Sequence, residues 1–390
     1  MDFELNEDQL AYQRLARDFA GHELAPHAAR WDAEQHFPRE ALRRAGELGF
    51  CGLYSPEAQG GLGLTRLDAA ILFEELAAAD PSTTAFITIH NMATWMLCTW
   101  GGEALKAEWG ARLTSGAKLA SYCLTEPDAG SDAASLKTTA RRDGDGPDAG
   151  YVLKGSKMFI SGAGDTDLLV VMARTGGPGA KGISAFAVPA DAPGLRYGKE
   201  EEKMGWNSQS TRAVFFDDVR VPAASRLGEE GEGFRIAMKG LDGGRINIAI
   251  CSVGAAQGAF SAAQRYLGER RQFGKALAEF QALQFRLADM ATELVAARQM
   301  VRLAASRLDA GARDATTYCA MAKRFATDAG FQICNEALQL HGGYGYLRDY
   351  PLERLLRDAR VHQILEGTNE IMRVIIARRM LEADAPDQVR

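Results

Sequence analysis

Residues 283–308, LQFRLADMATELVAARQMVRLAASRL, carry one apolar stripe with an unbroken four-three spacing. A stripe of this period lies along one narrow face of a long helix, as in helical bundles and subunit interfaces. The region before it repeats the pattern, so the sequence predicts a four-helix bundle or a packed subunit face and no cofactor box. The two stripes consist of Leu283, Leu287, Met290, Leu294, Ala297, Val301, Ala304 and Leu308, and of Val253, Ala256, Phe260, Ala263 and Leu267.

Upstream of this bundle, the pattern of the chain changes twice. Residues 5–119 are rich in Ala, Leu, Glu and Arg and predict helices broken at prolines and at a glycine cluster. Between them and the bundle, the buried-strand runs at 168–172 and 212–216 indicate a small antiparallel sheet. We expect a mostly helical α+β chain with a helical domain at 1–119, a β domain at 120–225 and a helical bundle domain at 226–390.

Composition limits the classes of partner. The chain has 390 residues, a formal net charge of -6 and a sequence pI near 5.7, which argues against nucleic acid as a partner. Six scattered cysteines without a Cys-x-x-Cys pair favour a reducing compartment. No signal or transit pattern and no long uninterrupted apolar run is visible, so we expect a cytoplasmic protein without membrane insertion, or a mitochondrial matrix protein if a presequence has been removed.

Several common catalytic motifs are missing from the sequence. It contains no Gly-x-Gly-x-x-Gly after a strand, no P-loop and no Gly-x-Ser-x-Gly elbow. His22 and His27 are five residues apart with a proline between them, which does not suit a zinc helix. The sequence therefore predicts no bound metal.

One carboxylate has the surroundings of a catalytic base. Glu366 follows the apolar pair Ile364 and Leu365 and precedes Gly367, between two helical stretches. Apolar neighbours would raise the carboxyl pKa, and the glycine would let the backbone turn sharply beside a ligand. The alternative is a solvated glutamate ahead of a helix capped by Thr368.

Two segments of the predicted sheet domain have side chains suited to a flat heterocycle. Residues 122–132, YCLTEPDAGSD, read as a strand that breaks into a polar loop, although an ordinary strand-to-loop turn explains them equally simply. Phe159 and Ser161 share one face of a strand, where they could stack on a ring and hydrogen-bond to it. Phe159 as a plain core residue is the open alternative.

Three further segments combine cations with glycines. These are 242–245 (DGGR) at a predicted helix start, 270–274 (RRQFG) at a helix end, and 339–345 (QLHGGYG). Arginine pairs with phosphate through two parallel hydrogen bonds, and glycine allows close approach of the backbone. Arg270 and Arg271 alone would also suit a solvated helix end.

These segments, in this order, resemble the acyl-CoA dehydrogenase family, and the resemblance covers residues 3–382. It implies an N-terminal helical domain, a middle β-barrel-like domain and a C-terminal four-helix bundle. Motifs at 157–164, 205–209, 243–249 and 364–367 are most similar to the isobutyryl-CoA dehydrogenase branch, which acts in valine catabolism. The resemblance thus implies a flavin-dependent oxidoreductase with FAD as its cofactor.

The resemblance also assigns residues to ligands. Asp128 departs from the glycine usual in the flavin loop, and Phe159 and Ser161 replace the family's usual Trp and Thr. Positions matching FAD contacts, partly from a neighbouring subunit, are Tyr122, Cys123, Leu124, Thr125, Glu126, Pro127, Asp128, Ala129, Gly130, Ser131, Phe159, Ile160, Ser161, Arg270, Phe280, Gln281, Gln339, Leu340, His341, Gly342, Gly343, Thr368, Asn369 and Glu370. Positions matching acyl-CoA contacts are Ser131, Asp242, Gly243, Gly244, Arg245 and Arg378.

The family's chemistry implies roles for these residues. Some relatives carry their base near residue 244, but here only Glu366 can serve, removing the α-proton of an acyl-CoA while flavin N5 takes the β-hydride. Expected partners are a short branched acyl-CoA, with isobutyryl-CoA giving methacrylyl-CoA, an electron-transfer flavoprotein, and further subunits in a homotetramer built as a dimer of dimers. The alternatives are a 2-methylbutyryl- or butyryl-CoA dehydrogenase, an acyl-CoA oxidase, or an inactive helical assembly protein.

Overall fold

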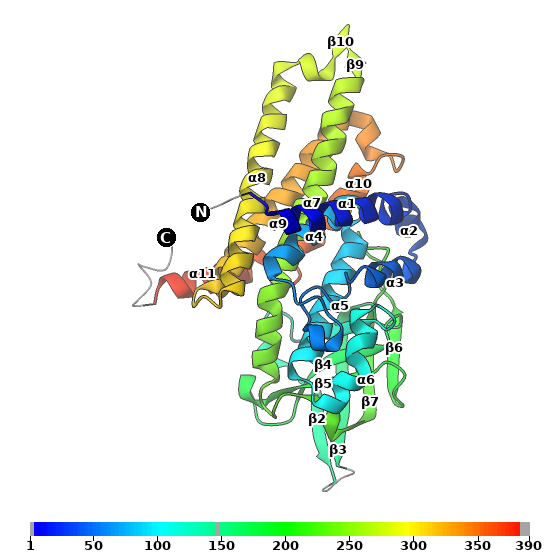
Figure 1. Cartoon of the computed structure of the whole chain (residues 1–390), viewed down its shortest axis with the longest axis vertical. Helices are drawn as coiled ribbons and strands as arrows, with labels where there is room; N and C mark the ends of the chain where they lie inside the picture. Colours follow the sequence, from blue (N-terminus) through cyan, green and yellow to red (C-terminus); the bar gives the residue numbers. More distant parts are fainter. Residues whose placement is uncertain (1–3, 145–148, 383–390) are drawn as a thin grey trace.

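The computed structural model describes residues 4–144 and 149–382. In Figure 1, a mixed sheet occupies one end of an elongated molecule, and long helices extend from it to a small hairpin at the other end. The N-terminal helices pack along one side of this assembly. The three-part arrangement of helices, sheet and helices expected from the sequence is confirmed.

The N-terminal part is helical. Its first helix begins with a capping box, in which Asn6 and Gln9 satisfy each other's backbone N–H groups. Asp80 caps the longest helix of this part, which starts at Pro81 because proline needs no hydrogen-bond acceptor in a first turn. The helices are α1 (Glu7–Phe19, continued by a π-helical turn Ala20–Leu24), α2 (Ala28–Glu34), α3 (Arg39–Glu47), α4 (Arg66–Ala79), α5 (Pro81–Trp100) and α6 (Glu103–Thr114).

The middle part is an eight-stranded sheet in the order β6-β7-β3-β2-β4-β5-β8, with β1 paired to β4. Its pairs are mostly antiparallel, but β1 runs parallel to β4, so the expectation of a purely antiparallel sheet was wrong. β2 and β3 intervene between β1 and β4 in the chain, so no hairpin turn forces this pair to be antiparallel. The strands are β1 (Ala120–Cys123), β2 (Thr139–Asp143), β3 (Gly150–Ser161), β4 (Leu168–Arg174), β5 (Ile183–Pro189), β6 (Leu195–Glu200), β7 (Thr211–Pro222) and β8 (Arg226–Leu227).

The C-terminal part is built around one long helix, α7 (Gly233–Glu269), which packs against α4, α5, α8 and α9. Its predicted stripe is core, since Val253, Ala256, Ala263 and Leu267 are buried. A division of the chain at residue 226 would separate β8 from its partner β5. The remaining elements are β9 (Arg271–Gln272), β10 (Lys275–Ala276), α8 (Gln281–Asp309), α9 (Ala315–His341), α10 (Leu352–His362) and α11 (Asn369–Met380).

The central helix α7 joins the helical layers to the sheet. Its second half packs in the helical core with α4, α8 and α9, and its first turns, at Ile236 and Ala237, pack against the sheet and α5. Among the described residues, α7 alone is long and apolar enough to span a membrane, but 72% of its most apolar window is buried inside the fold. Its apolar character is therefore accounted for by its place in the core.

Candidate active site

Glu366 lies in the short connection between α10 and α11. Its φ is +56° and that of Gly367 is +91°, so two successive residues adopt the left-handed conformation. Such a conformation is costly for a residue with a side chain and persists where the surrounding structure enforces it, often at functional sites. The backbone N–H of Asn369 closes the turn by donating to the carbonyl of Gln363 at 3.0 Å. As expected, Thr368 caps α11, accepting from the N–H of Ile371.

A buried lysine holds this connection in place. Lys323 of α9 is fully buried, and its Nζ donates to the carbonyl oxygen of Gly367 at 2.8 Å and to Oδ1 of Asn369 at 2.9 Å. The sequence interpretation missed this residue. It lies on the same face of α9 as Cys319, Ala326 and Ile333, so a lysine on an apolar stripe was the available signal.

The carboxylate of Glu366 faces a glycine of the central helix. A Cβ added at Gly244 would lie 2.2 Å from Oε2 of Glu366, so only glycine leaves room for this carboxylate. Oε2 is itself buried and has no hydrogen-bond partner within residues 4–144 and 149–382. Burial raises the pKa of Glu366 to about 7, although the charges of Arg245 and Lys323 work in the opposite direction. The alternative of a solvated glutamate is therefore wrong.

The Asp242–Arg245 segment lies inside α7, not at a helix start as the sequence suggested. Gly243 and Gly244 resemble a helix start in the sequence. In the structure, their lack of a Cβ leaves room for the side chains packed against the helix. Arg245 is buried and donates from Nη1 to Oδ1 of Asp242 at 2.8 Å, and the hydroxyl of Thr316 donates to Oδ2 of Asp242 at 2.7 Å. Burial raises the pKa of Asp242. The Nε of Arg245 is buried and unpaired in the part of the chain that the structure describes.

The predicted flavin loop begins at the end of β1 and turns back tightly. Glu126 and Ala129 exchange two backbone hydrogen bonds of 3.1 Å, which leaves Pro127 and Asp128 exposed at the tip. Asp128 is absent from the residues with positive φ, so the turn does not require the glycine usual in the family. Its carboxylate lies 3.1 Å from Nζ of Lys137. The Cys123 and Leu124 side chains point into the core.

A buried ion pair fastens this loop to the sheet. Lys157 of β3 is fully buried and donates from Nζ to Oε1 of Glu126 at 2.8 Å and to the carbonyl of Leu124 at 3.0 Å. The same carboxylate accepts the backbone N–H groups of Lys137 and Thr138. These three donors, Lys157 Nζ and the two backbone N–H groups, hold the Glu126 side chain against the sheet, so its role in the loop is structural.

Phe159 follows Lys157 in the strand at a β-bulge. The pairing of β3 with β7 shifts register between Lys157 and Ile160, and Phe159 takes a left-handed φ of +59°. Its side chain is 63% exposed, so the alternative of a plain core residue is wrong. Ile160 is buried in the sheet core and Ser161 is half-buried. A strained, exposed aromatic ring is available for stacking on a ligand.

Tyr122 brings the flavin loop near the base. Its hydroxyl is buried and has no hydrogen-bond partner among the described residues. Burial raises the pKa of Tyr122 well above its usual value, and the nearby charge of Glu366 raises it further. The unpaired tyrosine and glutamate oxygens thus belong to one buried site.

A second buried network supports the α10–α11 connection. Trp206 donates from Nε1 to Nε2 of His362 at 3.2 Å, so Nδ1 of His362 carries the proton and donates to the hydroxyl of Ser252 at 2.7 Å. Burial lowers the pKa of His362 to about 3, which keeps the ring neutral. The backbone N–H of Trp206 donates to Oδ1 of Asp358 at 2.6 Å. The C-terminal half of the helix that precedes Glu366 is therefore fixed.

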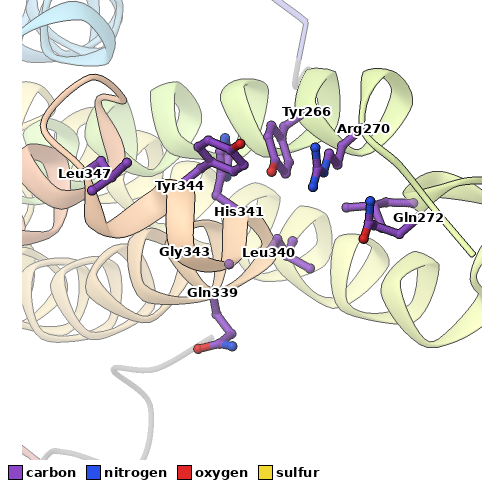
Figure 2. A pocket seen from close by; sticks show the side chains of 11 residues that line it. Tyr266, Arg270, Gln272, Gln339, Leu340, His341, Gly343, Tyr344 and Leu347 are labelled. Atoms are coloured by element: carbon purple, nitrogen blue, oxygen red, sulfur yellow. The ribbon is translucent and has the colours of Figure 1, made fainter.

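A separate cavity of about 420 Å³ lies near the hairpin end of the molecule. Figure 2 shows Arg270, Tyr266, His341 and Tyr344 gathered around it, while the side chain of Gln339 points away. His341 stacks on Tyr266 with ring centroids 4.3 Å apart, and the Arg270 guanidinium lies 5.5 Å from the centre of the Tyr344 ring. Arg270 has no ion pair within the described residues.

The cavity collects only part of the predicted ADP-binding set. Arg270 and residues 339–343 line it, whereas Phe280 and Gln281, at the start of α8, do not. Phe280 instead packs against Phe273 of the hairpin and under Nζ of Lys275. Of the other predicted contacts, Ser131, Glu370 and Arg378 are exposed, and Asn369 is buried with its side-chain amide bonded to α9.

The two groups of predicted residues are far apart within one chain. Gly244, which faces the base, and Arg270, which lines the cavity, lie at separate places along α7. Their separation is roughly 39 Å at the helical rise of about 1.5 Å per residue. The predicted contacts near the base and the predicted ADP contacts therefore lie in two separate regions of the chain.

Family comparisons agree with this architecture. The models described as acyl-CoA dehydrogenase N-terminal, middle and C-terminal domain match residues 6–117, 121–219 and 231–381. The chain belongs to the acyl-CoA dehydrogenase family, whose members are flavin-dependent oxidoreductases, and it is an acyl-CoA dehydrogenase.

Individual relatives resemble the whole chain. Mitochondrial isobutyryl-CoA dehydrogenase of Bos taurus is 54% identical over 97% of this chain and 90% of its own length. A chain from a structural study of the electron transferring flavoprotein of Acidaminococcus fermentans is 42% identical with a TM-score of 0.94, over 98% of this chain and all of that one. Butyryl-CoA dehydrogenase from Megasphaera elsdenii is 39% identical with a TM-score of 0.94 over the same shares.

The family uses FAD, and the residues present fit that cofactor. Phe159 on β3 has an exposed aromatic ring, and Tyr122 on β1 has a hydroxyl that is unpaired among the described residues. An arginine lines the distant cavity with two exposed glycines, Gly342 and Gly343. Among the described residues Tyr122 and Arg270 make no side-chain hydrogen bond or ion pair, and the groups suit a ring system at one place and a phosphate at the other.

Proposed function

We propose that this chain catalyses FAD-dependent α,β-dehydrogenation of a short branched acyl-CoA, with isobutyryl-CoA giving methacrylyl-CoA as the best candidate. The observation that carries the proposal is the Glu366 carboxylate, buried against Gly244, unpaired, and with its pKa raised to about 7. A base with a pKa near neutrality, held where water is excluded, suits removal of a weakly acidic C–H proton.

Removing an α-proton from a thioester leaves enolate-like charge that the site must stabilise. Glu366 takes the proton, and buried Arg245 supplies positive potential in a region of low dielectric, joined by the protonated form of Lys323, whose pKa burial lowers to about 7. The strained left-handed turn fixes the carboxylate, because Lys323 holds the carbonyl of Gly367. Bound FAD would supply the acceptor for the β-hydrogen, transferred as hydride to N5. Tyr122, Phe159 and Ser161 are the residues we assign to holding its ring system.

Short, branched acyl groups are favoured by the apolar surroundings of the base. Ala85, Trp206 and Ile248 form a small buried cluster, against which Ile89 and Leu365 pack. Leu365 is the immediate neighbour of Glu366 in the sequence, and we assign the acyl group to the side of the base on which this cluster lies. The 54% identity to an isobutyryl-CoA dehydrogenase supports the same acyl class.

We further propose that FAD is bound between subunits of a homotetramer arranged as a dimer of dimers. The separation of Arg270 from the base along α7 supports this, since a neighbouring chain can supply one of the two ends. The hairpin supports it too, because Phe273 at its tip is 92% exposed, as expected for an interface residue. An electron-transfer flavoprotein is the proposed electron acceptor, in keeping with the Acidaminococcus fermentans relative.

Anaerobic flavin reduction across a panel of acyl-CoAs tests the proposal. Isobutyryl-CoA should bleach the visible flavin band fastest, ahead of 2-methylbutyryl-CoA and butyryl-CoA. Faster bleaching by either of the other two would replace the acyl assignment while keeping the enzyme class. Rapid reoxidation by dioxygen in air would indicate an oxidase, and a purified protein that takes up no FAD would support an inactive assembly protein.

A further inference from the structure

A third buried cation lies beside the proposed site and, unlike Arg245 and Lys323, has no role in the mechanism above. Arg66 is the first residue of α4, directly after the N-cap Thr65, and is 8% exposed. Its guanidinium carbon lies 3.5 Å from the centre of the Tyr54 ring and 4.8 Å from that of Trp95. Cation–π contacts with two rings hold the guanidinium in one orientation.

The charge of Arg66 is only partly offset among the described residues, where Asp309 lies near enough for this charge to counteract the rise that burial causes in the pKa of Asp309. No ion pair joins Arg66 to a carboxylate of residues 4–144 or 149–382, and its Nη1 is buried without a hydrogen-bond partner. Asp309 accepts the backbone N–H groups of Arg66 and Leu67 and makes no hydrogen bond to the guanidinium. Other buried arginines do have partners, as Arg245 has Asp242 at 2.8 Å. An unpaired buried guanidinium is costly unless a ligand supplies the acceptor.

The unpaired nitrogen points at the same stretch of α7 as the base. A Cβ added at Gly243 would lie 2.4 Å from Nη1 of Arg66, and one at Gly244 would lie 2.2 Å from Oε2 of Glu366. Successive glycines therefore make room for a donor and a base at the same turn of α7, on adjoining sides of the helix. Arg66 stacks on the ring of Tyr54. Burial raises the pKa of the hydroxyl of this tyrosine, and the charge of Glu366 also acts on it and raises it further. One ligand lying across these glycines would meet both side chains.

We propose that Arg66 is a substrate-binding residue that donates a hydrogen bond from Nη1 to a carbonyl oxygen in the thioester and pantetheine part of the acyl-CoA. This inference rests on the proposed function. A saturated branched acyl group has no acceptor to offer, whereas the thioester and the pantetheine amides each offer a carbonyl. The Glu366 carboxylate must reach the α-carbon of the acyl group. The thioester and pantetheine follow directly on that carbon, so this part of the acyl-CoA lies opposite Gly243.

Three substitutions test the role. Arg66→Met removes the donor, Arg66→Lys keeps the charge without the planar fork, and Gly243→Ala displaces the guanidinium without removing it. In a Glu366→Gln background the flavin is not reduced, so the dissociation constant of isobutyryl-CoA is measured from the shift of the visible band. We expect Arg66→Met to raise it about 10- to 100-fold, the range for hydrogen bonds to charged groups, with smaller increases for the other two.

The control is Thr65→Ala, which removes the cap of the same helix without touching the site and should lower the melting temperature but leave binding unchanged. S-isobutyryl-N-acetylcysteamine and S-isobutyryl propanethiol separate the two carbonyl sources in the otherwise wild-type enzyme. If Arg66 binds the pantetheine amide, loss of Arg66 raises KM only for S-isobutyryl-N-acetylcysteamine. If Arg66 binds the thioester carbonyl, loss of Arg66 lowers kcat for both compounds.

Two results would overturn the inference. One is an unchanged dissociation constant in both flavin-loaded Arg66 variants and in Gly243→Ala. The other is an Arg66-dependent preference for an acyl-CoA with a terminal carboxylate, which would show that Arg66 binds the acyl group. If no acyl thioester reduces the wild-type flavin, the dehydrogenase proposal itself fails, and that outcome is visible before any Arg66 variant is made.

Discussion

Gly244 lies inside α7 and Arg270 directly follows its last residue, but their surroundings differ in almost every respect. Around Gly244 the chain buries ionisable side chains from α9 and the α10–α11 connection, and their geometry is fixed by hydrogen bonds. Around Arg270 the cavity is lined by exposed glycines and aromatic rings. The neighbouring hairpin turns through Phe273 and Gly274, both with positive φ.

A single chain supplies all the described groups of the Gly244 region, whereas it leaves the Arg270 region exposed. The base, its glycine clearance and its supporting lysine all come from a single chain, so catalytic geometry is set when that chain folds. The Arg270 region presents a free cation and an almost fully exposed aromatic side chain, features typical of a surface that a partner or ligand covers. Substitutions in the two regions should therefore fail in different ways.

The largest effect is expected at the base. Glu366→Gln keeps the size of the side chain but removes its basicity, so substrate-driven bleaching of the flavin should slow about 10²- to 10⁴-fold. FAD content and oligomeric state should not change, because the carboxylate bonds to no other side chain of the described residues. Stopped-flow reduction and the ratio of visible to protein absorbance measure both. Normal bleaching in this variant would remove Glu366 from its assigned role.

A single methyl group should damage the same region nearly as much. Gly244→Ala places a Cβ on the Glu366 carboxylate, the movable end of a flexible side chain, so the protein should fold with its base displaced. A misplacement of this size lowers the rate of flavin reduction by roughly 10²-fold. Gly268→Ala is the matched control on α7, since nothing lies within 4 Å of its added Cβ. Equal rates in the two variants would show that the clearance at Gly244 is not needed.

The sequence predicted the parts of the molecule that follow from local patterns. The four-three stripe of α8, the apolar run of β4 and the Thr368 cap need only a period or a neighbouring residue, and each is confirmed. The burial of the Glu366 carboxylate was predicted from Ile364 and Leu365, but Ile364 is 51% exposed, whereas Gly244 of α7 lies against the carboxylate.

Features created by contacts between distant segments were not predictable in this way. Lys323 and Arg66 lie 43 and 300 residues from Glu366 in the sequence. Only folding brings Lys323 to the turn that contains Glu366, and Arg66 to the glycines of α7. The exposure of Phe159 depends on a bulge set by the pairing with β7. The Asp242–Arg245 segment was misplaced because glycines beside a charged residue resemble a helix end when their packing partners are unknown.

The Arg270 region should respond through cofactor retention. Arg270→Ala removes the cation of the cavity, so we expect FAD to bind about 10-fold more weakly, as for loss of a charged hydrogen bond. The rate of reduction in the fraction that keeps its flavin should be nearly normal, which contrasts with Glu366→Gln. Arg271→Ala, an exposed neighbour outside the cavity, is the control. Unchanged flavin content after dialysis of Arg270→Ala would remove this residue from the cofactor site.

The smallest effect, and the finest test of the Gly244 region, is the pH dependence of flavin reduction. Burial raises the pKa of Glu366 from its usual 4.5 to about 7, and only the ionised carboxylate accepts a proton. The limiting rate at saturating acyl-CoA should therefore fall as pH drops through 7, to about one-fifth between pH 7 and pH 6. FAD retention should stay constant over this range, because no group of comparable pKa lines the Arg270 cavity except His341, whose pKa burial lowers. A rate that stays flat down to pH 5.5 would mean that the Glu366 carboxylate is hydrated in solution. The Gly244 region would then be as open to water as the Arg270 region.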